Sequence, residues 1–503
     1  MTPEPARAPA RRSRAYLFLC SAVTLIAAGL VWYSQTMAFA WDEGFHMLCA
    51  QLIAAGRRPY VDFAFCQTPL NAYWNALWLT IFGQTWRVPH AIAAVCVAGA
   101  VLLMADYVFE RVPVPRWRLA AALVAALLFG LNIAVVDYGT LGQAYGLCLL
   151  LIAAAFRFSV AGVDRSSPAL AAAAGLASGA AACASLLTAP VAPVLLLWML
   201  VANRAGRRLV KAAAFIVGAA VSFLPVLALY VQSPRNVVFG ILQYNLLFRA
   251  VQWEGSWRQN FEVYFSWIDS SHALLLILLG AAGLFFVAFR SDWERRVRSE
   301  LYLCGWLALA LSVHISTARP TFSRYYLLAV PFLALLAAAG FYWVATRLFH
   351  PGRPLWPTLA LVLLVTLMQG QSLYESRDDF TWHTLDGVSK KVAEVTPPNA
   401  LLRADEQVYF LSQHRPPSGM ELADSHKLEF PPALNAQLHL MSGKELERRT
   451  KAGDFDTFQT CDDESDFPSL GLDRLYAHKA TVESCTVFWG PNRAPATAAA
   501  SGH

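Results

Sequence analysis

The chain has 503 residues, of which 57% are hydrophobic and only 15% are charged. Soluble domains carry roughly 25% charged residues, so this composition excludes an ordinary soluble protein and indicates an integral membrane protein. The net charge of +6 is spread over short loops and forms no basic run of the kind that binds nucleic acids, so we expect no nucleic-acid partner.

Apolar stretches that can cross a hydrocarbon core, which takes roughly 20 residues per helix, recur along the chain. They predict a mostly α fold, a polytopic bundle of about eleven transmembrane helices. The first stretch, 16–34, is long enough to cross a membrane and is expected to be an uncleaved helix. The fifth and sixth are too short for two full spans, so a shortened hairpin turning at Pro190 and Pro193 is expected. The expected spans are 16–34, 89–109, 118–136, 141–158, 169–187, 188–202, 211–231, 272–289, 300–316, 325–347 and 355–371.

Arginine-rich loops orient this bundle, because basic residues favour the cytoplasmic side of a membrane. Arg11, Arg12 and Arg14 precede the first span, and further basic loops lie at 110–118, 203–211 and 290–298. The N-terminus is therefore expected in the cytoplasm and, after eleven spans, the C-terminus outside. Three long segments then face outward: 35–88, 232–271 and the tail from 372.

These outer segments contain structure of their own. Residues 43–56 have apolar residues at helical spacing, typical of an amphipathic helix in the interface plane. A second helix begins at Pro69. The tail is mixed in composition and predicts a small extracytoplasmic α+β domain over 372–503, separate from a transmembrane domain over 1–371. Cys461 and Cys485 both lie in it, and they are predicted to form a disulfide if the tail is in an oxidising compartment.

Asp42 and Glu43 emerge where the first span meets the outer interface. One interpretation is that they are solvated loop acids, or that Asp42 caps the helix over 43–56. A second is that a carboxylate at the membrane surface serves as general base for an acceptor hydroxyl or amine. A third is that the pair holds a divalent metal, which two adjacent acids permit and do not demand.

The surrounding residues favour the second interpretation. The order Asp42-Glu43, Gly56, Tyr60-Val61-Asp62 and Thr68-Pro69-Leu70 resembles the first outer loop of GT-C glycosyltransferases. More narrowly, it resembles bacterial relatives of the dolichyl-phosphate-mannose protein mannosyltransferases and of the lipid A aminoarabinose transferase. The resemblance covers the first ninety residues well and the eleven-span plan loosely, and it does not extend to the tail.

This resemblance implies a hexosyl- or pentosyltransferase in a bacterial inner membrane. It would move a sugar from a polyprenyl-phosphate-linked donor to a lipid, glycan or protein acceptor, with inversion. Asp42 would activate the acceptor, and Glu43 or Asp62 would orient the acceptor or a metal. Asp137 and Tyr138, at the outer end of the third span, could line the cavity, whereas His46 is expected to be an interface histidine.

One departure concerns the lipid phosphate. Several relatives have Lys or His just before the proline turn, where this chain has the neutral Gln67. Phosphate contact would then come from arginine, whose planar fork matches phosphate oxygens. The candidates are Arg57, Arg58, Arg249, Arg258, Arg319 and Arg324, the last followed by Tyr325 and Tyr326 in a segment that also resembles the family. The alternative for each arginine is simple snorkelling to lipid headgroups.

Two other classes of function remain. A membrane transporter or flippase of lipid-linked saccharides should have polar or broken helices near the midplane. A structural or sensory protein would carry its function in the tail, and a change at Asp42 would then be harmless. The sugar, the acceptor, the need for a metal and the oligomeric state cannot be read from the sequence.

Overall fold

The computed structural model describes residues 14–37, 42–202, 208–249, 257–375, 382–422, 426–461 and 470–492. The chain folds as two compact units. Unit 1 comprises Met1–Ser34, His90–Leu224 and Trp253–Arg377, and unit 2 comprises Gln35–Pro89, Pro225–Gln252 and Asp378–His503. The arginines at 11 and 12, which oriented the bundle in the sequence, lie outside the described residues.

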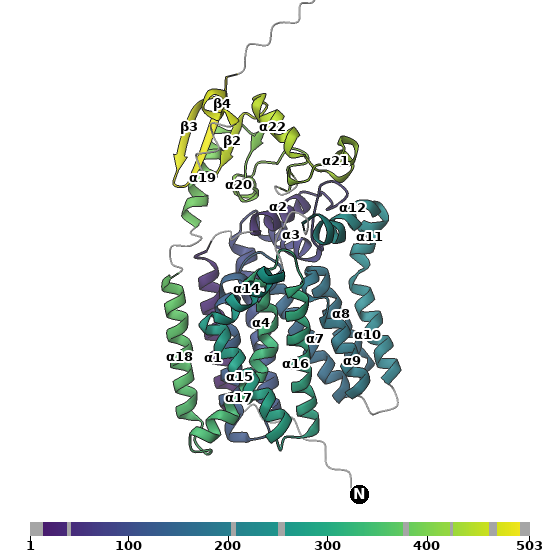
Figure 1. Cartoon of the computed structure of the whole chain (residues 1–503), viewed down its shortest axis with the longest axis vertical. Coiled ribbons are helices and arrows are strands. Elements are labelled where there is room, and N and C mark those ends of the chain that lie inside the picture. Colours follow the sequence, from purple (N-terminus) through teal and green to yellow (C-terminus); the bar gives the residue numbers. More distant parts are fainter. Residues whose placement is uncertain are drawn as a thin grey trace, which may run out of the picture. The chain divides into compact units, whose positions relative to one another are not determined.

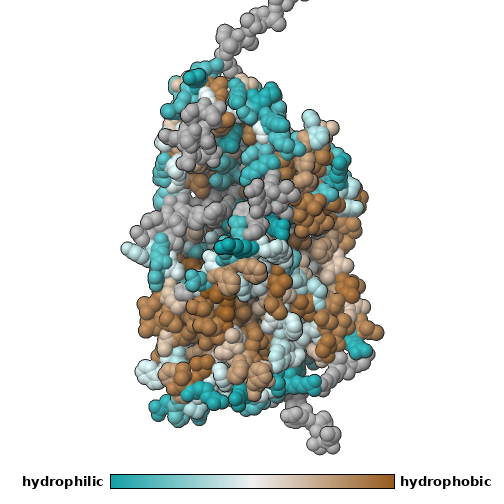
Figure 2. All heavy atoms as spheres, viewed as in Figure 1, coloured by the Kyte–Doolittle hydropathy of each residue, from teal (hydrophilic) through white to brown (hydrophobic). Residues whose placement is uncertain are grey.

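Unit 1 is a bundle of long helices that run side by side (Figure 1). Figure 2 shows hydrophobic residues gathered over these helices, as expected where a helix faces lipid. The helices are α1 (Arg14–Ser34), α4 (Arg87–Arg111), η1 (Pro115–Trp117), α5 (Arg118–Gly130), α6 (Ile133–Gly139), α7 (Tyr145–Asp164), α8 (Pro168–Ala184), η2 (Leu186–Thr188), α9 (Val191–Ala202), α10 (Arg208–Ser222), α14 (Trp257–Asp269), α15 (Ser271–Phe285), η4 (Phe286–Arg290), α16 (Arg295–Ser316), η5 (Ser323–Ala329), α17 (Val330–Leu348) and α18 (Leu355–Glu375).

The expected spans coincide with these helices, and the polytopic helical fold is confirmed. By length and composition, seven helices of the described chain can cross a membrane, or up to nine if each of two bent pairs is one span. The bent pairs are α5 with α6, at 54°, and α10 with α11 (Leu224–Gln232), at 46°. The fifth and sixth spans are the shorter apolar helices Pro168–Ala184 and Leu186–Ala202. Pro190 lies in the turn between η2 and α9, whereas Pro193 lies in the first turn of α9, where proline is tolerated.

Glycines allow pairs of bundle helices to approach closely. A Cβ atom added at Gly175 of α8 would lie 1.9 Å from the carbonyl oxygen of Phe215 in α10, and one at Gly283 of α15 would lie 2.0 Å from that of Leu336 in α17. Side chains larger than hydrogen are therefore excluded at both crossings. Close packing of small residues is the usual means of helix association where lipid is as apolar as the helices themselves.

Ion pairs join several helices of unit 1. Arg157 of α7 contacts Asp106 and Glu110 of α4 at 2.6 and 2.9 Å. The buried Glu300 of α16 accepts a hydrogen bond from Tyr107 at 2.9 Å and pairs with Arg111 at 3.1 Å, both on α4. Some basic residues that indicated the cytoplasmic face are thus also neutralised by acids of neighbouring helices.

Unit 2 combines two outer segments with the tail. Its small sheet has the order β1-β2-β4-β3, with β1 parallel to β2 and the other neighbours antiparallel, so the predicted small α+β domain is confirmed. Its elements are α2 (Glu43–Ala54), α3 (Leu70–Phe82), α11, α12 (Pro234–Val238), η3 (Phe239–Phe248), α19 (Trp382–Val395), β1 (Leu402–Arg403), α20 (Glu406–Ser412), α21 (Pro432–Leu438), α22 (Gly443–Lys451), β2 (Thr457–Thr460), α24 (Leu472–Leu475), β3 (Tyr476–Val482) and β4 (Cys485–Pro491).

Two features stabilise the tail. Phe458, Leu472, Tyr476 and Phe488 form a small hydrophobic core on the sheet. A disulfide joins Cys461, directly after β2, to Cys485 at the start of β4. Closing a loop with a sequence separation of 24 restricts the unfolded chain, which is worth roughly 3 kcal/mol in the loop-entropy description.

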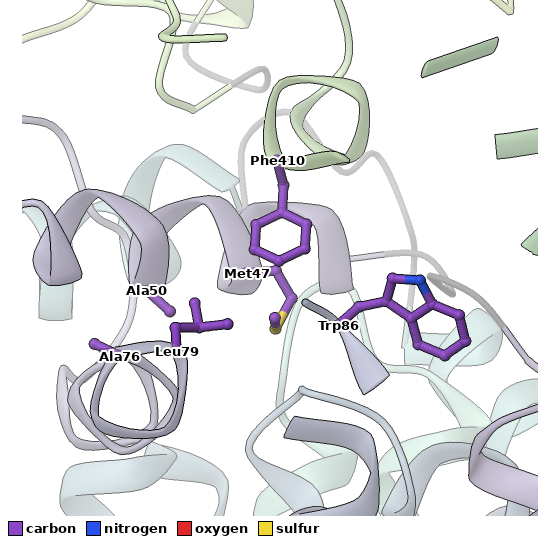
Figure 3. Packing of buried hydrophobic residues seen from close by; sticks show 6 residues of the cluster. All are labelled: Met47, Ala50, Ala76, Leu79, Trp86 and Phe410. Atoms are coloured by element: carbon purple, nitrogen blue, oxygen red, sulfur yellow. The ribbon is translucent and has the colours of Figure 1, made fainter. Parts of the chain in front are cut away.

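A second hydrophobic cluster joins the tail to the first outer segment. Phe410 of α20 points toward Met47 of α2, beside Ala50, Ala76, Leu79 and Trp86 (Figure 3). Unit 2 therefore includes residues 35–89 and 225–252, which a boundary at 371/372 had assigned to the transmembrane domain. The difference arises because these segments bury apolar side chains against the tail, a contact that no local pattern encodes.

Candidate functional site

The first candidate residues stand at the start of α2. Asp42 is the residue before the helix and is half-buried, whereas Glu43 is completely buried. The carboxylate of Asp42 makes no capping hydrogen bond to the described first turn of α2. The capping interpretation, in which this carboxylate would accept from a backbone N–H of that turn, is therefore not what the geometry gives. Of the two acids, Asp42 is the one that is partly exposed.

Helix α2 was expected to be an amphipathic helix in the interface plane, but the protein itself buries most of its surface. Nine of its twelve residues are buried, because α3 covers one side and α20 of the tail another. His46 is accordingly buried rather than at the interface, with its Nδ1 3.5 Å from Nδ2 of Asn71 on α3. Burial lowers the pKa of His46 to about 4, against the opposing effect of Asp42 and Glu43. At neutral pH this histidine is therefore an uncharged neighbour of the two acids.

The loop after α2 is held by its own charges. Arg57 donates to Oε1 of Glu421 at 2.9 Å and to the carbonyl oxygen of Asp62 at 2.5 Å. Arg58 binds the carboxylate of Asp62 through its backbone N–H and its guanidinium, and it also donates to Gln232 at 2.8 Å. These hydrogen bonds lower the pKa of Asp62. All three residues, considered as substrate ligands in the sequence, therefore have structural contacts that fix this loop.

Residues of the second outer segment donate hydrogen bonds to the backbone of the residues that precede Gln67. Tyr60 has a positive φ of 65°, which is costly for a bulky residue, and its hydroxyl donates to the carbonyl oxygen of Gln67. Asn236 donates to the carbonyl of Tyr60 and Asn245 to that of Cys66, both at 2.9 Å. The side chain of Gln67 is half-exposed, and Arg249 follows the end of η3 in the same unit.

Unit 1 has a second candidate group at the start of η5. The guanidinium of Arg324 is buried over the ring of Phe322, at 4.2 Å, and near the rings of Tyr325 and Tyr138, at 5.6 and 5.9 Å. Aromatic faces attract a guanidinium and hold its plane in a fixed orientation. Of the other candidates in unit 1, Arg258 is exposed and pairs with Glu262, and Arg319 lies 5.4 Å from the ring of Trp257.

Comparison with known proteins addresses the fold. No family model and no curated protein sequence matches the chain. Among solved structures, ArnT from Cupriavidus metallidurans bound to undecaprenyl phosphate matches with a TM-score of 0.66 at 14% identity, over 94% of this chain and 99% of that one. Its apo state gives 0.65 at 16% identity, over 95% and 100%. The apo oligosaccharyltransferase of Archaeoglobus fulgidus gives 0.51 at 13% identity, over 93% and 74%.

The chain has the GT-C fold. This confirms the fold that the residues around Asp42 had indicated, and it extends the likeness beyond the first ninety residues. The tail is included, since the match covers 94% of the chain. The sequence of the tail alone gave no sign of that relationship.

A metal site was the third interpretation of the acid pair. Within the described residues, no three or more His, Cys, Asp or Glu side chains gather as ligands. Asp42 and Glu43 supply two carboxylates, one of them wholly buried. A magnesium ion can bind through one or two carboxylates only when water and substrate phosphate complete its shell. The described residues thus do not form a metal site by themselves.

Several residues that contact the first outer loop and α2 were not among the candidates that the sequence indicated. Glu421 pairs with Arg57, Gln407 lies against Gly44 of α2, and Asn236 binds the carbonyl of Tyr60. Each is an ordinary polar residue in a segment without a distinctive motif. Only folding brings them to the first outer loop.

Proposed function

We propose that this protein is a membrane glycosyltransferase that uses a polyprenyl-phosphate-linked sugar. The observation that carries the proposal is the half-exposed Asp42 at the start of α2, in a chain with the GT-C fold. Two of the similar structures support the donor class, since ArnT is bound to undecaprenyl phosphate and the A. fulgidus enzyme AglB is in complex with a dolichol-phosphate. The acceptor would be a lipid, a glycan or a protein.

In the proposed reaction, an acceptor hydroxyl or amine attacks the anomeric carbon of the donor sugar. The bond from that carbon to the phosphate oxygen breaks, and the lipid phosphate leaves with the electron pair. Asp42 takes the proton of the acceptor, which makes the acceptor a stronger nucleophile. A single displacement of this kind inverts the configuration at the anomeric carbon.

Arginines stabilise the charge that develops on the leaving phosphate in this proposal. Arg324 is the best candidate, because three aromatic rings orient its fork and planar guanidinium groups match phosphate oxygens. Arg249 and Gln67 are further candidates for donor contact. Glu43, being buried beside His46, would help to position Asp42 without touching the substrate.

The proposed setting is a bacterial inner membrane with the tail on the extracytoplasmic side. The disulfide in the tail supports this orientation, because disulfides persist in oxidising compartments. The N-terminus would be cytoplasmic.

The change Asp42→Asn tests the catalytic part of the proposal. It keeps size and most hydrogen bonding but removes the proton acceptor, so sugar transfer should fall by about 10²-fold or more. Binding of the lipid donor should stay near the wild-type value. The matched control is Glu262→Gln, which neutralises an exposed acid of a surface ion pair and should leave transfer unchanged. Wild-type turnover in Asp42→Asn would eliminate Asp42 as the base.

A transporter or flippase of lipid-linked saccharides is the second candidate, and the two bent helix pairs are the observation in its favour. Purified protein in detergent micelles separates the two functions, since micelles have no compartments between which to transport. Transfer of sugar from a polyprenyl-phosphate donor in micelles supports the enzyme. No transfer with any donor and acceptor class, together with donor movement across proteoliposomes, would support the flippase. Added chelator in the same assay tests whether transfer needs a divalent metal.

A further inference from the structure

Helix α20 of the tail lies against the first turn of α2, which follows Asp42. A Cβ atom added at Gly44 would be 2.6 Å from Oε1 of Gln407, 2.8 Å from its backbone nitrogen and 3.1 Å from its Cβ. Real Cβ atoms essentially never come within 3.0 Å of such neighbours, so no side chain larger than hydrogen fits at position 44. The side chain of Gln407 could move aside, but its backbone nitrogen could not.

Contacts beyond the one at Gly44 also join α2 and α20. Gly44 faces Gln407 near both N-termini. One helical turn or more further on, Nε2 of Gln51 lies 3.3 Å from the carbonyl oxygen of Phe410 and 3.1 Å from Oε1 of Gln413. Between these contacts, Phe410 is fully buried against Met47 (Figure 3). Contacts along the length of α20 therefore fix both the distance and the rotation of α2.

Helix α20 is itself held by the sheet of the tail. The buried side chain of Gln459 on β2 accepts from the backbone nitrogen of Asp405 and donates to its carboxylate, both at 3.0 Å. The hydroxyl of Tyr409 donates to the carbonyl oxygen of Leu402 at 2.7 Å and accepts from the backbone nitrogen of Ala404 at 3.1 Å. The sheet, α20 and α2 thus form one series of direct contacts that ends at the turn carrying Asp42 and Glu43.

We propose that α20 positions the Asp42–Glu43 turn, with Gln407 as the positioning residue that sets its place through the contact at Gly44. This inference rests on the proposed glycosyl transfer, and it gives the C-terminal domain a part in that reaction. Neither Gln407 nor Gly44 touches the reacting atoms. Their effect is on where the carboxylate of Asp42 stands when the acceptor arrives.

The substitution Gly44→Ala tests the inference with one methyl group. Alanine is the better helix former, so without the neighbouring helix the change would be neutral or stabilising. Here it forces α2 and α20 apart. Because a displacement of about 1 Å at reacting groups can cost about 10²-fold in rate, we expect kcat to fall by about 10- to 100-fold. The KM for the donor should stay within about twofold, because donor contacts are not altered.

Two further variants make the result specific. Gly29→Ala in α1 is the matched control, since a Cβ there meets nothing within 4 Å, and its kcat should equal that of the wild type. Gln407→Ala removes the side-chain contact without the clash and should lower kcat less than Gly44→Ala. Native-state hydrogen exchange of the α2 amides serves as a readout independent of activity, and it should be faster in Gly44→Ala than in the wild type.

Each outcome decides one question. If the wild type transfers sugar and Gly44→Ala equals it in kcat and in exchange, the positioning role is overturned. An equal rise in KM and fall in kcat, with α2 exchange unchanged, would also overturn it. If the wild type transfers no sugar from any donor, the proposed function fails. Exchange in Gly44→Ala would then still show whether α20 fixes α2.

Discussion

The ion pair between Arg57 and Glu421 joins the first outer loop to the tail, and a double-mutant cycle can measure its strength. The side chain of Glu421 is 1% exposed and that of Arg57 is 31% exposed, with 2.9 Å between Nη2 and Oε1. Exposed pairs contribute about 0.2–1 kcal/mol, whereas hydrogen bonds to charged groups inside a protein contribute about 1.5–3 kcal/mol. Because the acid is buried and the base only partly exposed, we expect a coupling energy of about 1.5–3 kcal/mol.

The two single substitutions should differ. Among the described residues, Arg57→Met leaves the buried carboxylate of Glu421 with only the backbone nitrogen of Gly419, at 2.8 Å, as hydrogen-bond donor. The loss of one partner of a buried pair costs about 3–5 kcal/mol. Glu421→Met leaves a guanidinium that can still reach water and the carbonyl of Asp62, so it should cost less. Contacts that each residue makes elsewhere cancel in the coupling term, because the single and double variants lose them alike.

Native-state hydrogen exchange of the α20 amides is the assay, because it reports the local free energy of opening without unfolding the membrane bundle. Donor KM is measured on the same variants. A coupling energy below about 0.5 kcal/mol would refute a stabilising role of the Arg57–Glu421 ion pair, since an exposed pair would give as much. A raised donor KM in Arg57→Met, with Glu421→Met close to wild type in KM and exchange, would instead support Arg57 as a ligand of the donor phosphate.

Three other outcomes are expected. Arg324→Lys keeps the charge but loses the planar fork, so the donor KM should rise several-fold; an unchanged KM would move the phosphate contact to another arginine. The pKa of His46 is lowered to about 4 in the folded protein, so as the pH drops the unfolded chain takes up the proton before the folded chain does. Stability should therefore fall as the pH drops from about 6.5 to 4. His46→Gln should flatten this pH dependence, measured by hydrogen exchange of the α2 amides, and an equal slope in both proteins would contradict the prediction. A cysteine placed at Ser418 should react with an impermeant thiol reagent in spheroplasts, and protection until the membrane is opened would reverse the orientation.

The sequence by itself determined the membrane class and most of the bundle. Long apolar runs are local and need no partner to be recognised, because a helix that satisfies its own backbone is the simplest structure able to cross lipid. The place of Asp42 and Glu43 directly after the first span also picked out this pair of acids. Cys461 and Cys485 stood out because both lie in the polar tail, and the structure joins these two cysteines in a disulfide. Where spans were short or bent, as at 118–136 and 211–231, hydropathy gave their existence but not the breaks at 54° and 46°.

Only the tertiary structure decided what the polar residues of the first outer loop contact. Arg57 and Asp62 were plausible substrate ligands in the sequence, and the structure gives them partners that hold the loop, one of them 364 residues away. The helical spacing of apolar residues in α2 predicted one apolar face, but α3 and α20 cover two sides of the helix. His46 is buried and neutral as a result. Periodicity reports that a face is apolar and not what will cover it, because the covering helix belongs to a distant segment whose own pattern is ordinary. For the same reason, the place of Asp42 depends on Gln407, and nothing local to either residue reveals the other.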